Sequence, residues 1–306
     1  MSEIPSPSTM TSETFQIALN CYPSIVEKVY KSKIKDAKKV TDAIERERWR
    51  FEELPSTVAQ LRSPGSTKVT IGKGKIDVRE RGLAKDAIER LVQWKITHGH
   101  SRPFLPAMVR KNEPSAVEAQ TALALEKLLA TSDLSEPTPT PTIVEALNAV
   151  CKLTGIGPAT GTLILNIFDP VHIPFFQDEM YAWFFPDTKT DKLKYTQKEY
   201  LQMLEAVRPV LQRLSVKAIE LEKVSYVLGH LDLLDEQDKK SILASSRNES
   251  RQDATKATED VKVDNTRESQ PEPTPSIKKG KKRGANIAIE ADQVQQPTKR
   301  QTRRKG

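Results

Sequence analysis

Cysteine is scarce in this sequence, because only Cys21 and Cys151 occur among its 306 residues. Two thiols are too few for a disulfide-stabilised scaffold, a four-thiolate zinc site or a cysteine-ligated iron–sulfur cluster. The four histidines show no metal-ligand spacing with these two cysteines. We therefore expect neither a metal site nor a cofactor.

Long hydrophobic runs are also missing. No stretch approaches the roughly 18 consecutive apolar residues of a membrane-spanning helix, so we expect no contact with a membrane. The first residues, Met1 to Thr11, have neither a basic start nor an apolar stretch, which argues against a secretory signal. These absences together predict a soluble intracellular protein.

Positive charge is present, but it is concentrated at one end of the chain. The formal net charge is +7, and residues 277–306 alone carry ten basic and two acidic side chains. This segment contributes +8 and leaves −1 for all preceding residues. The overall charge therefore does not indicate a folded DNA-binding surface.

The C-terminal part has the composition of a disordered tail. No aromatic residue follows Tyr226, and residues 235–306 show weak apolar periodicity, so we predict that they form no packed core. Two basic clusters, Lys278–Arg283 and Lys299–Lys305, are separated by about fifteen residues, a spacing that looks like a bipartite nuclear import signal. We expect a nuclear location and an import receptor that binds residues 278–305. The alternative is a solvated basic tail that contacts any polyanion.

The remaining sequence has a helical pattern and predicts an all-α domain over residues 12–234, after a disordered N-terminus at residues 1–11. Pro23 is expected to divide its first helical segment in two. A Pro/Thr-rich linker is predicted within the domain at residues 131–142, because alternating prolines disfavour a helix there.

The most informative segment, Leu153–Leu165, follows this linker and one predicted helix. Gly155 and Gly157 allow a tight turn, and Pro158 suits the first position of a second helix, where no amide hydrogen is needed. Amides of the turn and of the helix start are left free, so the turn can hold a phosphate without a side-chain cation.

This segment resembles the helix-hairpin-helix motif, whose consensus is Leu-Pro-Gly-Val/Ile-Gly followed by a helix of small residues. Thr154 stands in place of the usual proline. The resemblance implies non-specific binding of the DNA backbone. The expected contact residues are Gly155, Ile156, Gly157, Ala159 and Thr160.

Some DNA glycosylases share this hairpin. In the bifunctional members a Schiff-base lysine stands where this chain has Ala159, so the resemblance implies no lyase step from the hairpin. In these enzymes an aspartate opens a helix shortly after the hairpin and serves in base excision, and Asp178 matches that position. A group of uncharacterised fungal and animal proteins is similar too, and shares the segment Trp94-Lys-x-x-His98-Gly-x-x-Arg102-Pro103. His98 and Arg102 of this segment are candidates for supporting contacts. His98 stands beside a helix-ending glycine, where a hydrogen-bond donor meets free carbonyls, and Arg102 could contact a phosphate or a carboxylate such as that of Asp178.

Three hypotheses follow from the sequence. The first is a nuclear DNA-associated protein, a non-catalytic relative of the glycosylases. The second is a monofunctional DNA glycosylase that uses Asp178, and the third is a helical protein-interaction scaffold in which the hairpin is only structural. An Asp178 carboxylate that faces a solvent-reachable cavity favours the enzyme, whereas one that caps its own helix favours the other two.

Overall fold

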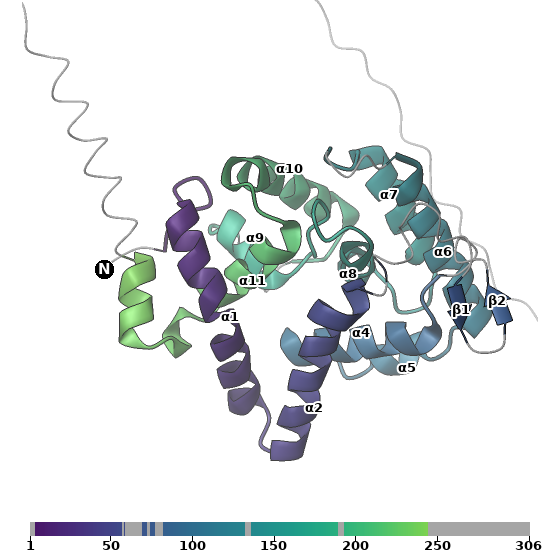
Figure 1. Cartoon of the computed structure of the whole chain (residues 1–306), viewed down its shortest axis with the longest axis horizontal. Helices are drawn as coiled ribbons and strands as arrows, with labels where there is room; N and C mark the ends of the chain where they lie inside the picture. The colour runs from purple at the N-terminus through teal and green to yellow at the C-terminus, as the bar shows by residue number, and fades with distance from the viewer. Residues whose placement is uncertain are drawn as a thin grey trace, which may run out of the picture. The chain divides into compact units, whose positions relative to one another are not determined.

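A computed structural model describes residues 4–56, 58, 69–71, 74–76, 82–131, 136–188 and 193–243. These residues belong to one compact unit, Met1–Asp260. The described elements, in chain order, are the helices and strands α1 Ser12–Lys33, α2 Ala37–Arg48, the π-helix η1 Trp49–Glu53, β1 Val69–Ile71, β2 Gly74–Ile76, α4 Lys85–His98, α5 Leu105–Val109, α6 Pro114–Thr131, α7 Thr140–Val150, α8 Pro158–Phe168, α9 Asp178–Phe184, α10 Gln197–Leu214, α11 Ala218–Gly229 and the 3₁₀-helix η4 Leu231–Leu233 (Figure 1).

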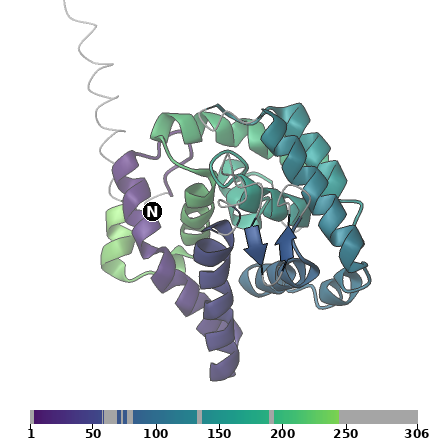
Figure 2. The ribbon, with the colours of Figure 1, turned by 45° about the vertical axis from the view of Figure 1, so that its right-hand side comes forward.

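The fold is all-α, as the sequence predicted. Its one departure within the described residues is the antiparallel pair β1–β2, in which Val69 pairs with Ile76 (Figure 2). None of the described helices is long and apolar enough to cross a lipid bilayer. The basic clusters at residues 278–305 lie outside the described residues.

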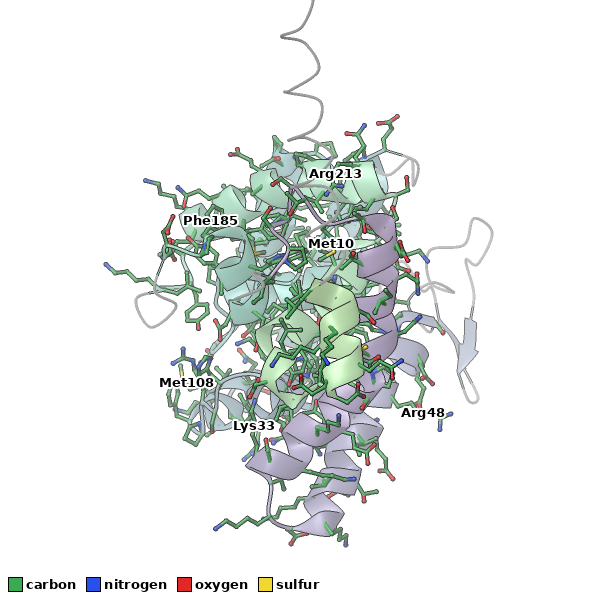
Figure 3. The ribbon with its side chains drawn as sticks, turned by 90° about the vertical axis from the view of Figure 1, so that its left-hand side faces the viewer. Met10, Lys33, Arg48, Met108, Phe185 and Arg213 are labelled. Carbon is green, nitrogen blue, oxygen red and sulfur yellow. The ribbon has the colours of Figure 1, made fainter. Side chains whose placement is uncertain are left out.

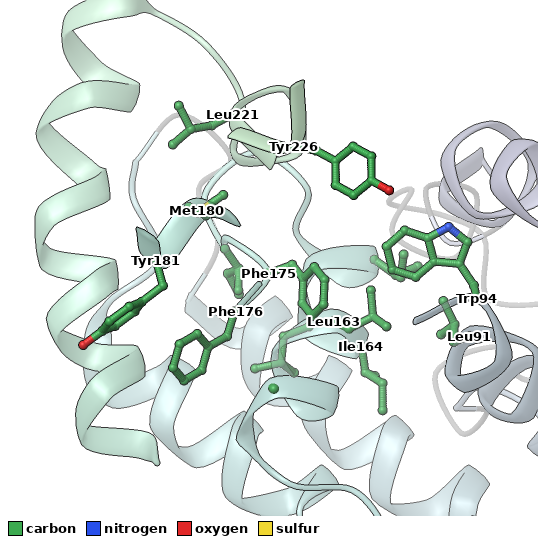
Figure 4. Close-up of a cluster of buried hydrophobic side chains, with 14 of the residues drawn as sticks. Leu91, Trp94, Leu163, Ile164, Phe175, Phe176, Met180, Tyr181, Leu221 and Tyr226 are labelled. Carbon is green, nitrogen blue, oxygen red and sulfur yellow. The ribbon is translucent and has the colours of Figure 1, made fainter. Parts of the chain in front are cut away.

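Helix α8 is the centre of the domain. All its residues from Ala159 to Phe168 are buried, and it packs against α4, α6, α7 and α10. Figure 4 shows the aromatic side chains Phe175 and Phe176 beside Leu163 and Ile164 of this helix. The turn that precedes α8 is therefore held by a helix that cannot move without disturbing the core.

The first helix is not divided at Pro23. Helix α1 runs through this residue without a break. Pro23 is exposed, whereas Tyr22 and Ile25 on either side of it are buried. Packing of the buried face thus outweighs the local cost of the proline.

The N-terminal segment is ordered from Ile4 onward, so the prediction of disorder is wrong for these residues. Met10 is fully buried, and its carbonyl accepts a hydrogen bond of 2.8 Å from Arg213 (Figure 3). Trp183 donates to the carbonyl of Pro5 at 2.8 Å. Two long side chains and one buried methionine fix this segment.

Two other boundaries differ from the prediction. Residues 236–243 are helical and Ile242 is fully buried, so the domain extends beyond residue 234. In the predicted linker, α7 already begins at Thr140, because Pro141 lies in the first helical turn, where a missing amide costs little. The buried Thr138 donates to Asp169 at 2.6 Å, which ties the irregular residues before α7 to the domain.

Candidate functional site

The turn between α7 and α8 has the backbone that the glycine pattern predicts. Gly155 has φ +80°, a left-handed conformation that side chains disfavour. A Cβ atom there would lie 3.0 Å from Cβ of Met108 and 3.1 Å from a methyl group of Val109. Both conformation and space therefore require glycine at this position.

Asn112 holds this turn from outside. Its amide nitrogen donates to the carbonyl of Thr154 at 2.9 Å, and its carbonyl oxygen accepts from the Thr154 amide at 2.8 Å. Proline, the usual residue of the motif here, has no amide to donate. Threonine at position 154 thus gains a paired contact with the loop after α5.

The five predicted phosphate contacts fall into two groups. Among the described residues, the backbone amides of Gly155, Gly157 and Ala159 have no hydrogen-bond acceptor. Ile156 donates instead to the carbonyl of Leu153, and Thr160 donates to that of Gly157. Three donors, that of Gly155 in the turn and those of Gly157 and Ala159 at the start of α8, are therefore available to an anion. Gly157 is exposed, and a Cβ atom on it would meet nothing within 4 Å.

A cavity of about 250 Å³ opens beside this turn. Its volume is slightly below the range of roughly 300–1,000 Å³ for small-molecule pockets. The side chains that bring charge or hydrogen-bonding groups into it come from α4, the loop after α4, the start of α9 and the segment before α10. They are Lys95, His98, His100, Arg102, Gln177, Asp178, Glu179, Lys194 and Tyr195.

Asp178 lies in this cavity and does not cap its own helix. It is the first residue of α9, and its carboxylate pairs with His100 and accepts a hydrogen bond of 2.6 Å from the Tyr195 hydroxyl. Its side chain is 15% exposed, so solvent reaches the carboxylate. The preceding segment is fixed, because the Phe176 amide donates to Thr162 of α8 at 3.1 Å.

Tyr195 is held in an unusual conformation at this cavity. Its φ of +56° lies in the left-handed region, which is uncommon for a residue other than glycine. Burial and the neighbouring Asp178 raise the pKa of the Tyr195 hydroxyl, so the group stays protonated and donates to the carboxylate. The Arg102 guanidinium stacks over the tyrosine ring at 5.3 Å. Arg102 therefore lines the same cavity as Asp178, and its contact with a phosphate stays a prediction.

His98 occupies a different place from the one predicted. Its side chain is only 2% exposed, and its ring stacks between Trp94 and Tyr226 at centroid distances of 4.5 and 3.9 Å. Its Nδ1 lies 3.4 Å from the carboxylate of Glu47. His98 therefore forms an inner wall of the cavity and cannot reach a phosphate. His100 makes the contact with Asp178.

Sequence reasoning missed His100, Tyr195 and Lys95 as site residues. His100 and Lys95 lie within the segment that pointed to His98 and Arg102, but spacing alone does not tell which of two histidines two residues apart faces inward. Nothing in the local sequence around Tyr195 signals its role.

A second, larger hollow continues from the cavity. It has a volume of about 850 Å³, and it shares Gly99, His100 and Glu179 with the first cavity. Its other walls are α1, α2 and α4, which contribute the basic side chains Lys33, Lys39 and Arg46. Figure 1 shows α1 and α2 meeting at a tip, around which the chain has five lysines and one acidic residue between Lys31 and Lys39.

Among the described residues, no three His, Cys, Asp or Glu side chains lie close enough together to hold a metal ion. No protein-family model, curated protein or solved structure matches this chain.

Proposed function

We propose that this chain binds the phosphate backbone of DNA through the turn between α7 and α8. The observation that carries the proposal is the three free amides of Gly155, Gly157 and Ala159 at the mouth of a cavity that holds Asp178. Amides at a helix start favour an anion both by donating hydrogen bonds and through the helix dipole. Because these contacts do not involve bases, the binding is independent of sequence.

The second hollow offers a path for the neighbouring phosphates. Lys33, Lys39 and Arg46 line it, and it meets the first cavity at His100. Affinity for DNA depends mainly on how many phosphates are neutralised, so one hairpin alone would bind weakly. The net charge of residues 1–276 is near zero, but the lysines around the α1–α2 tip give this part of the surface a positive charge.

Gly157 provides a matched pair of variants for the test. Gly157→Asp and Gly157→Asn both place a good N-cap residue at the start of α8, in open space, so both should fold. Only aspartate adds a negative charge at the anion site. Both side chains can accept from the amides at the start of α8 and so compete with a phosphate, but only the aspartate also repels it. We therefore expect Gly157→Asp to weaken duplex binding by about tenfold at low salt and Gly157→Asn to weaken it less.

The measurement is fluorescence anisotropy over a salt series, on the full chain and on residues 1–260, which lack the basic clusters. Circular dichroism checks the fold of each variant. Equal affinity of both variants and the unsubstituted chain for duplex DNA would remove the proposal. The hairpin would then be a structural element of a helical interaction scaffold.

Base excision is the second candidate function, and the position of Asp178 favours it. The carboxylate faces the cavity and contacts His100 and Tyr195 from two other segments, whereas a purely structural role would have it cap α9. A carboxylate at such a site can stabilise the sugar cation that develops as a base leaves, or activate water. Duplexes that each carry one damaged base test this, with release of free base as the readout. Base release that is lost in Asp178→Asn supports excision by Asp178, and release that is unaffected excludes this role of the carboxylate. No release by the unsubstituted chain excludes excision of the damaged bases tested.

We also propose that the protein is nuclear, because of the basic clusters at residues 278–305. Their removal from a fluorescently tagged chain should shift the protein to the cytoplasm. Unchanged nuclear accumulation of the truncated chain would show that these clusters do not direct nuclear import.

A further inference from the structure

Gln177 brings a buried amide group to the wall of the cavity, directly before Asp178. Its side chain lines the cavity, and the residue is only 4% exposed. Among the described residues, its Oε1 is buried and accepts no hydrogen bond. A buried acceptor without a donor is costly and uncommon in a folded protein. This oxygen is therefore available to a donor on a bound ligand.

The other end of the same amide is fixed by helix α11. Nε2 of Gln177 donates to the carbonyl of Glu222 at 2.8 Å and to the hydroxyl of Ser225. Ser225 donates its own proton to the Glu222 carbonyl at 2.9 Å, so its oxygen accepts from the amide. Turning the amide over would place Oε1 against a carbonyl oxygen. The orientation of the amide is therefore fixed, and Oε1 remains an acceptor.

His98 adds a second atom without a partner to this wall. Its ring lines the cavity, and its Nε2 is buried without a hydrogen bond to any described residue. A ring nitrogen of histidine accepts or donates according to its protonation, whereas an amide oxygen only accepts. Of these two atoms, Oε1 of Gln177 therefore determines which kind of group a ligand must present.

The aromatic walls of the cavity indicate the shape of the ligand. Phe175, Phe176 and Tyr195 line it together with His98. Aromatic side chains favour flat heteroaromatic rings such as bases, which stack on them. A volume of about 250 Å³ suits one small ring system better than a larger molecule.

We propose that the cavity holds a base with an exocyclic amine, and that Gln177 is the residue that selects this base. The proposal rests on the base-excision function above, in which a base enters the cavity beside Asp178. The amine donates an N–H to Oε1 of Gln177. A carbonyl oxygen at the same ring position, as in a deaminated base, would instead place two acceptors against each other. Adenine and cytosine are therefore favoured over hypoxanthine and uracil.

Three small ligands that differ at one ring position test this on the full chain. 9-Methyladenine carries an amine there, 9-methylpurine a hydrogen and 9-methylhypoxanthine a carbonyl oxygen. A ligand-observed NMR titration measures the affinity of each ligand without any DNA. We expect 9-methyladenine to bind about tenfold more tightly than either of the other two, because only its amine satisfies Gln177. Equal affinities for the three ligands would overturn the proposal.

Two variants assign the preference to Gln177. Gln177→Met removes the acceptor and keeps the length of the side chain, so the three affinities should differ by less than about twofold. Ser225→Ala is the matched control, because it removes one hydrogen bond of Nε2 and leaves Oε1 in place. The preference should persist in Ser225→Ala, and its persistence in a folded Gln177→Met would overturn the role of Gln177. The ligand series on the unsubstituted chain decides the proposal even if Gln177→Met does not fold.

The ligand series also separates base selection from DNA binding. A preference for 9-methyladenine in a chain that binds no duplex would support the selective cavity while the DNA-binding function fails. No detectable binding of 9-methyladenine up to its solubility limit would reject the selective cavity, whether or not duplex DNA binds.

Discussion

The buried residues on one side of His98 and the cavity on its other side differ in how their carboxylates are paired. On the closed side, Glu47 accepts hydrogen bonds from Tyr22, Tyr30 and Trp94 and lies near the His98 ring. On the open side, the Asp178 carboxylate pairs with His100 and Tyr195 among the described residues, and solvent reaches it. A saturated carboxylate in the core supports the fold, whereas a carboxylate left accessible beside a cavity is available for chemistry.

The closed side also contains a buried ion pair. Arg50 and Glu222 are fully buried and lie 2.9 Å apart, and the guanidinium stacks on the rings of Phe51 and Trp94 at 4.1 Å. We call Glu47, Arg50, Trp94, His98 and Glu222 the closed network. Burial and pairing, rather than residue type, distinguish the closed network from the accessible Asp178. Substitutions on each side test this difference.

The largest expected effect is that of Arg50→Ala. It leaves the Glu222 carboxylate buried without its partner, which should lower the free energy of unfolding by about 3–5 kcal/mol. Urea denaturation followed by circular dichroism measures this. The control is the double variant Arg50→Met with Glu222→Leu, which removes both charges and should cost less than Arg50→Ala alone. A cost below about 1 kcal/mol for Arg50→Ala would contradict the structural role of the pair.

Glu47 should make stability depend on acid. Burial alone would raise the pKa of Glu47, but the His98 ring and the tyrosine hydroxyls outweigh it and lower the pKa from 4.5 to about 2. Its contribution is therefore complete above pH 4.5 and is lost as the pH falls toward 2, by on the order of 3 kcal/mol. Thermal unfolding between pH 2 and 7 measures this loss. In Glu47→Gln the slope over this window should shrink, and an unchanged slope would show that other groups cause it.

The sequence predicts those parts of the fold and site that depend on neighbouring residues. Gly155 and Gly157 indicate the turn in the sequence, and Gly155 requires glycine there because its φ is +80°. Asp178 opens a helix, as its sequence context indicates. In both cases the local sequence predicts the local backbone, whereas the contacts of Gly155 with Met108 and Val109 lie too far away in the sequence to be predicted.

The rest depends on contacts between distant segments. His100, Asp178 and Tyr195 meet across 95 positions of sequence, and the left-handed backbone of Tyr195 has no local signal. Met10 stands in a Ser/Pro/Thr-rich stretch without periodicity, yet Arg213 and the core retain it. The net charge of residues 1–276 did not indicate the lysines around the α1–α2 tip, because acidic residues elsewhere in the sequence cancel their charge in the sum.

A smaller effect is expected at Asn112, which pairs with the turn before α8. Asn112→Ala removes both hydrogen bonds to Thr154 and should lower the free energy of unfolding by about 1–3 kcal/mol. It should also weaken duplex binding, because the free amides lose their fixed geometry. Asn112→Asp keeps the acceptor for the Thr154 amide but places a charged oxygen against the carbonyls of Thr154 and Val109, so it should destabilise the domain at least as much. Binding by Asn112→Ala equal to that of the unsubstituted chain would show that the turn holds its shape unaided.

The smallest effect on stability is expected at Asp178, and this makes it the sharpest test of the comparison. Asp178→Asn keeps an oxygen that can accept from the Tyr195 hydroxyl, and it weakens only the partly exposed pair with His100. Unfolding should change by less than about 1 kcal/mol, the ordinary value of a solvent-accessible ion pair. Glu47→Gln, the same chemical change in the closed network, should cost clearly more. If Asp178→Asn destabilised the domain as much as Glu47→Gln does, the accessible carboxylate would have a structural role too. The proposal that Asp178 takes part in catalysis would then lose its main support.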